Sequence, residues 1–291
     1  MGLDRPTVAI VGGGAMGGLF GGLMAEKGLD VTLIDVWREH VDAIRAHGLR
    51  IVGVGGDRAI RIGATADAST LKSADVVLFQ CKAFANRRAA ESVRHLFKGA
   101  TVAISFQNGL GNEEALAEVL GAPNVMGGLT AQAGRVEQPG VVRNFGVNTH
   151  ASADIRRDKW KKLLGNVGRS ALSGVTDLRS MDIMAVPELQ AVVFRAVDEA
   201  AAVARAEGID LDTAEARSVL MTLTVSKDGG TGTAKSSLNG DLLNRRPTEV
   251  DYIYGTVARL GRARGVPTPT IDTLIGIVKG LESKYLARPK G

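Results

Sequence analysis

A glycine-rich turn near the start of the chain constrains the fold more than any other feature of the sequence. The apolar run Thr7–Val11 leads into Gly12-Gly-Gly-Ala-Met-Gly17, in which three glycines fit the spacing G-x-G-x-x-G. The first glycine of this pattern allows a tight turn, the second lets a pyrophosphate approach the backbone, and the third lets the following helix pack on the strand. The helix N-terminus then faces the phosphates. We therefore predict a strand, turn and helix that bind a dinucleotide through Gly12, Gly13, Gly14, Ala15, Met16 and Gly17. The alternative is a glycine-rich turn with no ligand.

The same segment raises the question of a membrane span. Residues 8–25 carry no charge over 18 positions, a length that spans a bilayer. Seven of these positions are glycine, however, and Glu26, Lys27 and Asp30 follow at once. The sequence therefore favours a cofactor-binding turn over a membrane helix.

An acidic residue follows the next apolar run. Asp35 ends the candidate strand Val31–Ile34, at the distance from the glycine-rich turn where an acidic side chain binds the ribose hydroxyls of a dinucleotide. A carboxylate there favours NAD and repels the 2′-phosphate of NADP, whereas Arg38 offers a partner for that phosphate. Asp35 has a second interpretation as a helix N-cap. The cofactor is therefore predicted as NAD or NADP, with a weak preference for NAD.

Strand and helix patterns alternate through the first half of the chain, which favours a parallel sheet covered by helices. A hairpin is expected around Gly55-Gly56, and a turn at Pro139-Gly140 between two extended stretches. From about residue 154 the patterns are long and helical, over 155–172, 187–207, 213–227, 247–264 and 270–285. We therefore predict an α/β Rossmann-type dinucleotide-binding domain over 1–153 and an all-helical domain over 154–291.

Composition narrows the class of protein. The net charge of +5 is weak and comes mostly from the second half of the chain, where it is too diffuse for a nucleic-acid-binding arm but allows mild attraction of an acidic substrate. The single cysteine, Cys81, excludes internal disulfides and fits a reducing cytoplasm. The four histidines show no spacing typical of a metal site. These features predict a cytoplasmic protein with a small-molecule substrate and no metal, nucleic-acid or membrane partner.

Three polar features of the helical half are candidates for chemistry. Lys162 and Asn166 are four residues apart and share one helix face, where they form a credible substrate-binding pair or a solvated lysine beside a structural amide. Ser236-Ser237 precedes Asn239 and Asp241, a cluster whose plain interpretation is helix capping. Glu249 follows Pro247 at a helix start, where a carboxylate is favoured by the helix dipole in any case.

These residues also carry a resemblance. The strings Trp160-Lys-Lys-Leu-Leu-Gly-Asn166, Ser236-Ser-Leu-Asn-Gly-Asp241 and Arg246-Pro-Thr-Glu-Val-Asp-Tyr252, together with Lys82-Ala83 and Gln107-Asn-Gly-Leu-Gly111, resemble the ketopantoate reductase family in content and order. The resemblance covers nearly the whole chain. It implies a Rossmann domain, a C-terminal domain like that of 6-phosphogluconate dehydrogenase, a substrate cleft between them and a dimer through the helical domain. It also implies reduction of a 2-oxo acid by hydride from a nicotinamide.

The resemblance assigns a role to each matching residue. Lys162 would be the general acid that protonates the carbonyl oxygen, and Glu249 would orient it while lying near the nicotinamide ribose. Asn166, Ser170 and Ser237 would hold the substrate. Asn108 would bind in the cleft beside substrate and nicotinamide, and Lys82 and Ala133 would line the cofactor side.

Two departures from the family pattern bear on the substrate. Ser170 stands where the family usually has an amide, and residues 176–180 replace a stretch that usually contains Asn-Gly. The chain is also short between His150 and Asp154, so either the sheet is trimmed or a segment is lacking. We predict a 2-oxo acid reductase, with 2-dehydropantoate (ketopantoate), a precursor in pantothenate biosynthesis, as the leading substrate. The alternatives are an NAD-dependent D-2-hydroxy acid dehydrogenase of the same family and a non-catalytic dinucleotide sensor.

Overall fold

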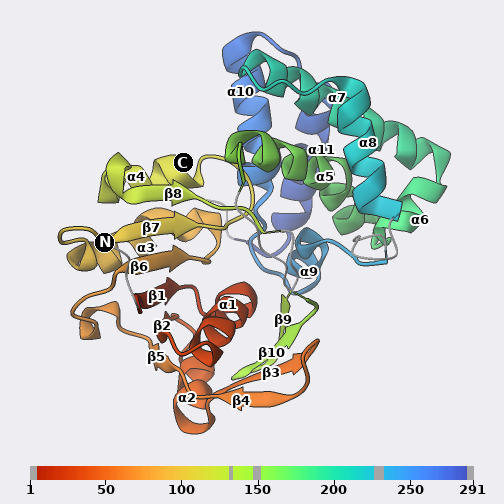
Figure 1. The fold of residues 1–291 in the computed structure, drawn as a ribbon. Helices are drawn as coiled ribbons and strands as arrows, with labels where there is room; N and C mark the ends of the chain where they lie inside the picture. The colour runs from red at the N-terminus through yellow and green to blue at the C-terminus, as the bar shows by residue number, and fades with distance from the viewer. Residues whose placement is uncertain (1–4, 131–133, 147–151, 226–232, 287–291) are drawn as a thin grey trace. The chain divides into compact units, whose positions relative to one another are not determined.

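The computed structural model describes residues 5–130, 134–146, 152–225 and 233–286. Contacts divide the chain into two units. The first, called the α/β unit, comprises residues 1–107 and 111–152, and the second, called the helical unit, comprises residues 108–110 and 153–291. Figure 1 shows the elements of each.

A six-stranded parallel sheet forms the centre of the α/β unit. Its strand order is β5-β2-β1-β6-β7-β8, and each neighbouring pair is parallel. The strands are β1 (Thr7–Val11), β2 (Asp30–Ile34), β5 (Gly63–Thr65), β6 (Val76–Phe79), β7 (Val102–Ser105) and β8 (Val125–Gly127). This arrangement confirms the predicted Rossmann-type fold, because the strand order reverses direction at β1, next to the glycine-rich turn.

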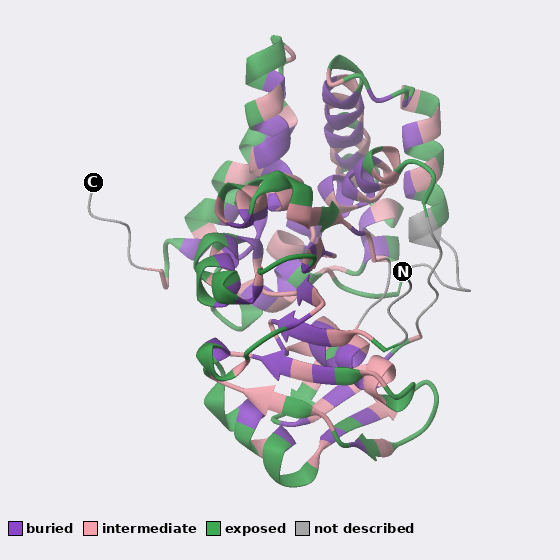
Figure 2. Cartoon of the chain, turned by 60° about the vertical axis from the view of Figure 1, so that its left-hand side comes forward, coloured by how far each residue is buried: buried purple, intermediate pink, exposed green. Residues whose placement is uncertain are grey.

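Helices pack on this sheet through two separate cores. Alternate residues of a strand point to opposite faces, so Val8 and Ile10 of β1 join one buried cluster and Ala9 and Val11 join the other. Figure 2 shows buried residues running along the strands. The helices are α1 (Ala15–Glu26), α2 (Arg38–His47), α3 (Asn86–Val93) and α4 (Asn112–Leu120), with short 3₁₀ turns at Ala68–Thr70, Ala83–Ala85, Arg94–Leu96 and Ala122–Asn124.

A second, smaller sheet completes the α/β unit. It has the order β4-β3-β10-β9, with β3 (Leu49–Gly53), β4 (Arg58–Ile60), β9 (Gly134–Gln138) and β10 (Val141–Asn144). The expected hairpin around Gly55-Gly56 is present, since β3 and β4 pair in antiparallel fashion. The expected turn at Pro139-Gly140 joins β9 and β10, which form a second antiparallel pair. The parallel pairing of β3 with β10 joins them into one sheet, and no local sequence pattern predicts it.

The helical unit contains only helices among its described residues. They are α5 (Ile155–Thr176), α6 (Ser180–Ala185), α7 (Pro187–Ala206), α8 (Thr213–Val225), α9 (Ser237–Leu243), a π-helical segment (Asp251–Gly255), α10 (Thr256–Arg264) and α11 (Pro269–Glu282). Its core is one buried cluster that includes Leu164 and Val167 of α5 with Val197 of α7. The prediction of an all-helical second half is confirmed.

Several element boundaries differ from the sequence-based expectation. The segment 247–264 does not form one regular helix, because the π-helical turn at Asp251–Gly255 precedes α10. Ser236 is the N-cap of the short helix α9, which begins at Ser237. Residues 226–232, which precede it, lie outside the described residues. The glycine-rich stretch 8–25 divides into β1 and α1, and no helix in the described part of the chain is long and apolar enough to span a bilayer.

Candidate active site

The glycine-rich turn leaves room only for glycine at two of its positions. Gly12 has a φ of +98°, and a Cβ added there would lie 2.4 Å from the backbone nitrogen of Cys81. A Cβ on Gly17 would lie 1.9 Å from the carbonyl oxygen of Gly12. The backbone of the turn therefore packs directly on the end of β6 and on the first turn of α1, as close packing of strand and helix in a dinucleotide-binding turn requires.

The middle of the turn is open by contrast. No atom lies within 4 Å of a Cβ added to Gly14, which is the N-cap of α1. Ala15 and Met16 begin this helix, and its first turn carries no acidic residue. Backbone N–H groups and the positive end of the helix dipole at such a site suit a phosphate. The residues present therefore fit the pyrophosphate of a dinucleotide.

Asp35 lies at the carboxyl end of β2, the same edge of the sheet as the glycine-rich turn. One carboxylate oxygen accepts a hydrogen bond from the backbone N–H of Trp37 at 2.9 Å. Asp35 therefore stabilises the turn that leads to α2, but it is not the helix N-cap, because that position is Trp37. Its half-buried side chain lies at the edge of the sheet where a ribose would bind. Arg38 begins α2 and is exposed.

His40 is a contact of the glycine-rich turn that the sequence does not reveal. Its fully buried ring accepts a hydrogen bond from the backbone N–H of Gly140 at Nδ1, so the proton of the neutral ring is on Nε2, which donates to the carbonyl of Gly13 at 3.1 Å. Burial lowers the pKa of His40, although the hydrogen bond to Gly13 and the charge of Asp35 oppose this. His40 thus ties the turn to the hairpin β9–β10.

A buried amide network fixes the loops that follow β6 and β7. Gln107 donates from Nε2 to the carbonyl of Cys81 and to Oδ1 of Asn86, both at 2.6 Å. Asn86 donates in turn to Asn112 at 2.9 Å. This network holds the backbone before Lys82, whose side chain is half-buried. Ala133 lies outside the described residues, and the cofactor roles of both residues stay predictions.

Lys162 is placed in the helical unit with a partner that restrains it. It lies on α5, and its Nζ donates a hydrogen bond to Oδ1 of Asn108 at 2.7 Å. Burial lowers its pKa from 10.5 to about 8, the charge of Glu249 raises it, and the charge of Lys159 lowers it further. A lysine with this pKa exchanges protons near neutral pH, as a general acid must.

Gly109 lets the segment that carries Asn108 pack closely on the π-helical segment of the same unit. Gly109 has a φ of +85°, and a Cβ there would lie 2.4 Å from the carbonyl oxygen of Tyr252. The N–H of Leu110 donates to the same carbonyl at 3.4 Å. Only glycine allows the backbone to approach the π-helical segment this closely, and Asn108 thereby meets Lys162.

Glu249 is buried, with 7% of its surface exposed, two residues before the π-helical segment. Its neighbour Thr248 is anchored from the other side, because both its backbone N–H and its hydroxyl donate to Glu282 at 2.7 Å. Glu249 acts on Lys162 through its charge, while Asn108 accepts a hydrogen bond from Lys162. The two residues predicted as catalytic therefore lie in one unit together with Asn108, and their catalytic roles stay predictions.

The remaining substrate candidates lie on α5 and α9. Asn166 follows Lys162 by one helical turn, and Ser170 is buried one turn further. Ser236 caps α9 by accepting a hydrogen bond from Asn239 N–H, and its hydroxyl donates to the carbonyl of Ser170 at 3.0 Å. Ser237 is exposed. The capping interpretation is thus confirmed for Ser236, and the role of Ser237 stays a prediction.

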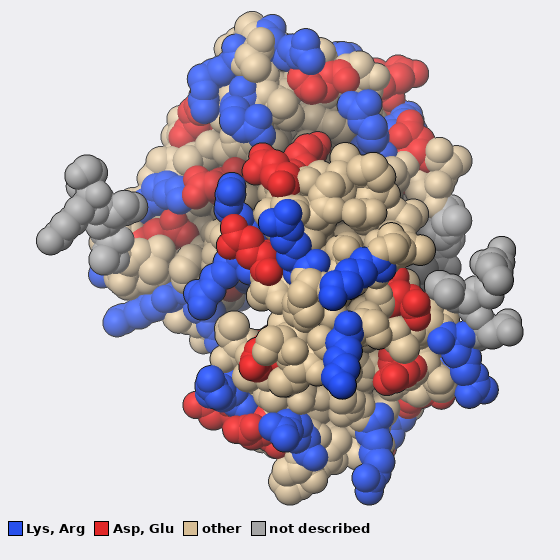
Figure 3. Space-filling view, turned by 90° about the vertical axis from the view of Figure 1, so that its left-hand side faces the viewer, with Lys and Arg blue, Asp and Glu red and all other residues tan. Residues whose placement is uncertain are grey.

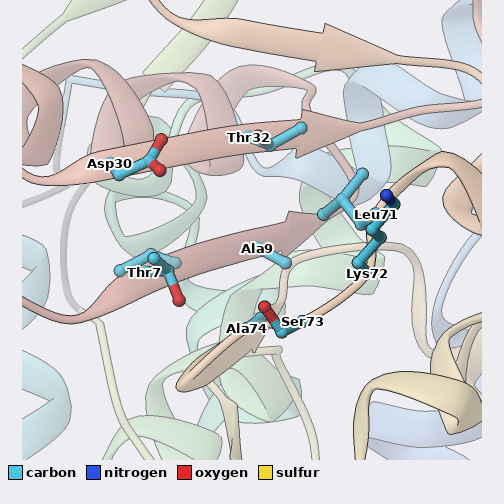
Figure 4. Close-up of a pocket in the computed structure, with 9 residues that line it drawn as sticks. Thr7, Ala9, Asp30, Thr32, Leu71, Lys72, Ser73 and Ala74 are labelled. Atoms are coloured by element: carbon cyan, nitrogen blue, oxygen red, sulfur yellow. The ribbon is translucent and has the colours of Figure 1, made fainter.

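A cavity of about 150 Å³ lies away from these groups, at the amino ends of the parallel strands (Figure 4). Thr7 and Asp30 open β1 and β2 there, and Leu71–Ala74 precedes β6. Ligands of open α/β sheets bind at the opposite, carboxyl edge. This cavity is therefore not the dinucleotide site.

Comparison with known families gives matches along almost the whole chain. The model "Ketopantoate reductase PanE/ApbA" matches residues 8–154, and "Ketopantoate reductase PanE/ApbA C terminal" matches residues 154–282. The 2-dehydropantoate 2-reductase of Pyrococcus abyssi is 30% identical over 305 residues, covering 95% of this chain and 98% of its own. That of Halobacterium salinarum is 30% identical over 304 residues, covering 94% and 97%.

Solved structures agree with this result. The ternary complex of D-mandelate dehydrogenase with NADH and anilino(oxo)acetate has a TM-score of 0.91 and 27% identity, covering 97% of this chain and 100% of its own. The PanE/ApbA family ketopantoate reductase of Ralstonia eutropha JMP134 has a TM-score of 0.88 and 29% identity, covering 96% and 99%.

Fold, site and relatives together define an NAD(P)-dependent oxidoreductase that acts on CH–OH groups. Within this class the chain belongs to the ketopantoate reductase family. The resemblance recognised from Lys162, Asn166 and Glu249 and their surrounding strings is thereby confirmed.

Proposed function

We propose that the protein reduces a 2-oxo acid to a 2-hydroxy acid, with 2-dehydropantoate as the leading substrate. The observation that carries this proposal is Lys162, half-buried on α5 with a pKa of about 8 and hydrogen-bonded to Asn108. We assign cofactor binding to residues 1–153 and substrate binding to residues 154–291.

Lys162 performs two tasks in this reaction. At neutral pH it is mostly protonated, and its positive charge polarises the substrate carbonyl in a buried site where charges interact strongly. It then gives its proton to the carbonyl oxygen as that oxygen becomes a hydroxyl. The hydrogen bond to Asn108 fixes the direction of the Lys162 ammonium. The charge of Glu249 raises the pKa of Lys162 and so favours the protonated form before the proton is transferred.

The cofactor supplies the hydride when it is bound. In this chain the turn from Gly12 to Gly17 would hold its pyrophosphate and Asp35 its ribose. Lys82 and Ala133 would line the cofactor side, and Asn108 and Glu249 would lie near the nicotinamide and its ribose. Asn166, Ser170 and Ser237 hold the hydroxyl and carboxylate of the substrate.

A D-2-hydroxy acid dehydrogenase is the second candidate. Asp35 offers a carboxylate at the ribose edge, which repels a 2′-phosphate and favours NADH. Ser170 is smaller than the amide usual in the family, which changes the substrate side of α5. D-mandelate dehydrogenase, solved with NADH, is also among the most similar folds.

A panel of 2-oxo acids separates these candidates. Purified protein is assayed with 2-dehydropantoate, phenylglyoxylate and branched-chain 2-oxo acids, each with NADH and with NADPH. The highest kcat/KM with 2-dehydropantoate supports the first candidate, and with phenylglyoxylate the second. No turnover with any of them contradicts both and supports a dinucleotide sensor.

The ribose role of Asp35 is tested in the same assay. Asp35→Ser is expected to raise KM for NADH more than for NADPH, because it removes a partner of the ribose hydroxyls and a charge that repels the 2′-phosphate. Asp30→Ser is the matched control, since Asp30 begins the same strand at its other end. An equal change for both cofactors would refute the role of Asp35.

The homodimer through the helical domain and the cytoplasmic location stay predictions. Light scattering of the purified protein tests the dimer. On the face that Figure 3 shows, Lys and Arg are interspersed with Asp and Glu, whereas nucleic-acid-binding surfaces carry a basic patch or stripe.

A further inference from the structure

Tyr254 joins the two segments that carry the proposed catalytic pair. Its side chain is fully buried. The hydroxyl accepts a hydrogen bond from the backbone N–H of Ala171 at 2.8 Å and donates one to the backbone carbonyl of Asn166 at 3.0 Å. Both partners lie inside α5, whereas Tyr254 lies in the π-helical segment that begins two residues after Glu249.

The position of this hydroxyl on α5 is unusual. Backbone groups in a helix interior normally pair with each other, four residues apart. Here a side chain from another segment bridges two groups that are five residues apart, at the turn that follows Lys162. Side chains that enter a helix ladder in this way bend it locally. The other end of the contact is a π-helical turn, a geometry that frequently occurs at functional sites.

The hydroxyl of Tyr254 also stays neutral. Burial raises the pKa of Tyr254 far above neutrality, although the hydrogen bond from Ala171 and the charge of Arg169 oppose this. The hydroxyl keeps its proton at every working pH and always donates to Asn166. It therefore acts as a fixed connection and does not relay protons.

We propose that Tyr254 is a positioning residue, whose hydroxyl holds the turn of α5 that follows Lys162 at a set separation from the segment that carries Glu249. Lys162 and Asn166 share one face of α5, and Glu249 lies five residues before Tyr254 in the chain. A shift between these segments changes both the burial of Lys162 and the influence of the Glu249 charge, the two largest effects on its pKa. The expected change in kcat rests on the proposed function. The expected change in the pKa of Lys162 does not, because it is measured without turnover.

The test removes the hydroxyl and keeps the ring. In Tyr254→Phe, loosening of α5 admits water to Lys162, so its pKa is expected to rise from about 8 toward the ordinary value of 10.5. The pKa is measured as the pH dependence of acylation of Lys162, followed by mass spectrometry of the full chain. The expected kcat for the 2-oxo acid falls about 10- to 100-fold, with unchanged affinity for the dinucleotide.

Tyr285→Phe is the matched control. It also removes a hydroxyl that donates to a backbone carbonyl, that of Arg246 at 3.0 Å, but this carbonyl lies outside α5. It is expected to leave the Lys162 pKa and kcat unchanged. 4-Aminophenylalanine at position 254 restores a donor toward Asn166 and is expected to return the Lys162 pKa toward about 8. This variant also serves if Tyr254→Phe does not fold.

The outcomes are separable. An unchanged Lys162 pKa in folded Tyr254→Phe, or a lower thermal midpoint with unchanged kcat, overturns the positioning role. If the unsubstituted protein reduces no 2-oxo acid, the proposed function fails, and the acylation measurement still decides the role of Tyr254.

Discussion

Replacing Lys162 by methionine is expected to abolish turnover and, at the same time, to stabilise the fold. Methionine fills the space of the lysine stem with no charge. The folded state holds the lysine ammonium in a buried site, so its proton is bound less tightly there than in the unfolded chain. The cofactor is expected to bind normally, since the glycine-rich turn is untouched.

The size of the effect follows from the pKa. A fall from 10.5 to about 8 corresponds to a cost of about 3 kcal/mol for holding the charged form in the folded state. The variant loses the hydrogen bond between Nζ and Asn108, which contributes about 1 kcal/mol. The net gain is about 2 kcal/mol at pH 7, or about 4–8 °C in the unfolding midpoint.

The pH dependence provides the sharper test. Below the folded-state pKa of about 8, Lys162 is charged in both the folded and the unfolded state, so the full cost of holding its charge in the folded state is present. Between about 8 and 10.5 the unfolded chain keeps a proton that the folded state has released, so the stability of the unsubstituted protein rises with pH. The advantage of Lys162→Met is therefore greatest below pH 8 and disappears as the pH approaches 10.5.

Urea unfolding followed by helical circular dichroism, from pH 7 to 10, measures this difference. Lys161→Met is the control, because Lys161 is next along α5 but pairs with Glu215 at 3.1 Å near the surface. That pair is worth at most about 1 kcal/mol, so the control gains no stability. If Lys162→Met is less stable than the unsubstituted protein at pH 7, the reasoning about its burial is wrong.

Two further predictions concern titrating groups. The rate of 2-oxo acid reduction is expected to fall above about pH 8, the pKa of Lys162. In Glu249→Gln this fall is expected to begin at lower pH, because the charge that raises the lysine pKa is gone. A fall at unchanged pH would contradict the electrostatic effect of Glu249 on Lys162. Burial lowers the pKa of His40. Below about pH 6.5 the unfolded chain therefore binds a proton at His40 more tightly than the folded state does, and the stability of the fold decreases as the pH falls through this range. His40→Gln keeps an acceptor for Gly140 and a donor for Gly13, and its unfolding at pH 5–8 is expected to lack this decrease; an identical decrease in both proteins would assign it to other groups.

Local patterns predicted those parts of the molecule whose contacts are local. The strand, turn and helix around Gly12 could be predicted because each glycine acts on the backbone beside it. The pairing of Lys162 with Glu249 came from the family resemblance, since no spacing shows that residues so far apart meet. His40 and Tyr254 were missed for the same reason, because each owes its role to backbone groups of distant segments. A buried histidine or tyrosine carries no mark in the sequence that distinguishes it from an ordinary core residue.

The pairing of β10 with β3 has a consequence for how the α/β unit folds. Val141 pairs with Arg50 in the register of these strands, so about 90 residues, including most of the large sheet, lie in the loop that this pairing closes. Contacts across so long a loop form late, because the chain loses much freedom before they contribute stability. During synthesis the edge of β3 therefore stays uncovered until β10 has emerged, and an exposed strand edge is a template for aggregation. The β9–β10 hairpin thus acts late as a protective cover, and truncation before Val141 would yield a chain prone to self-association.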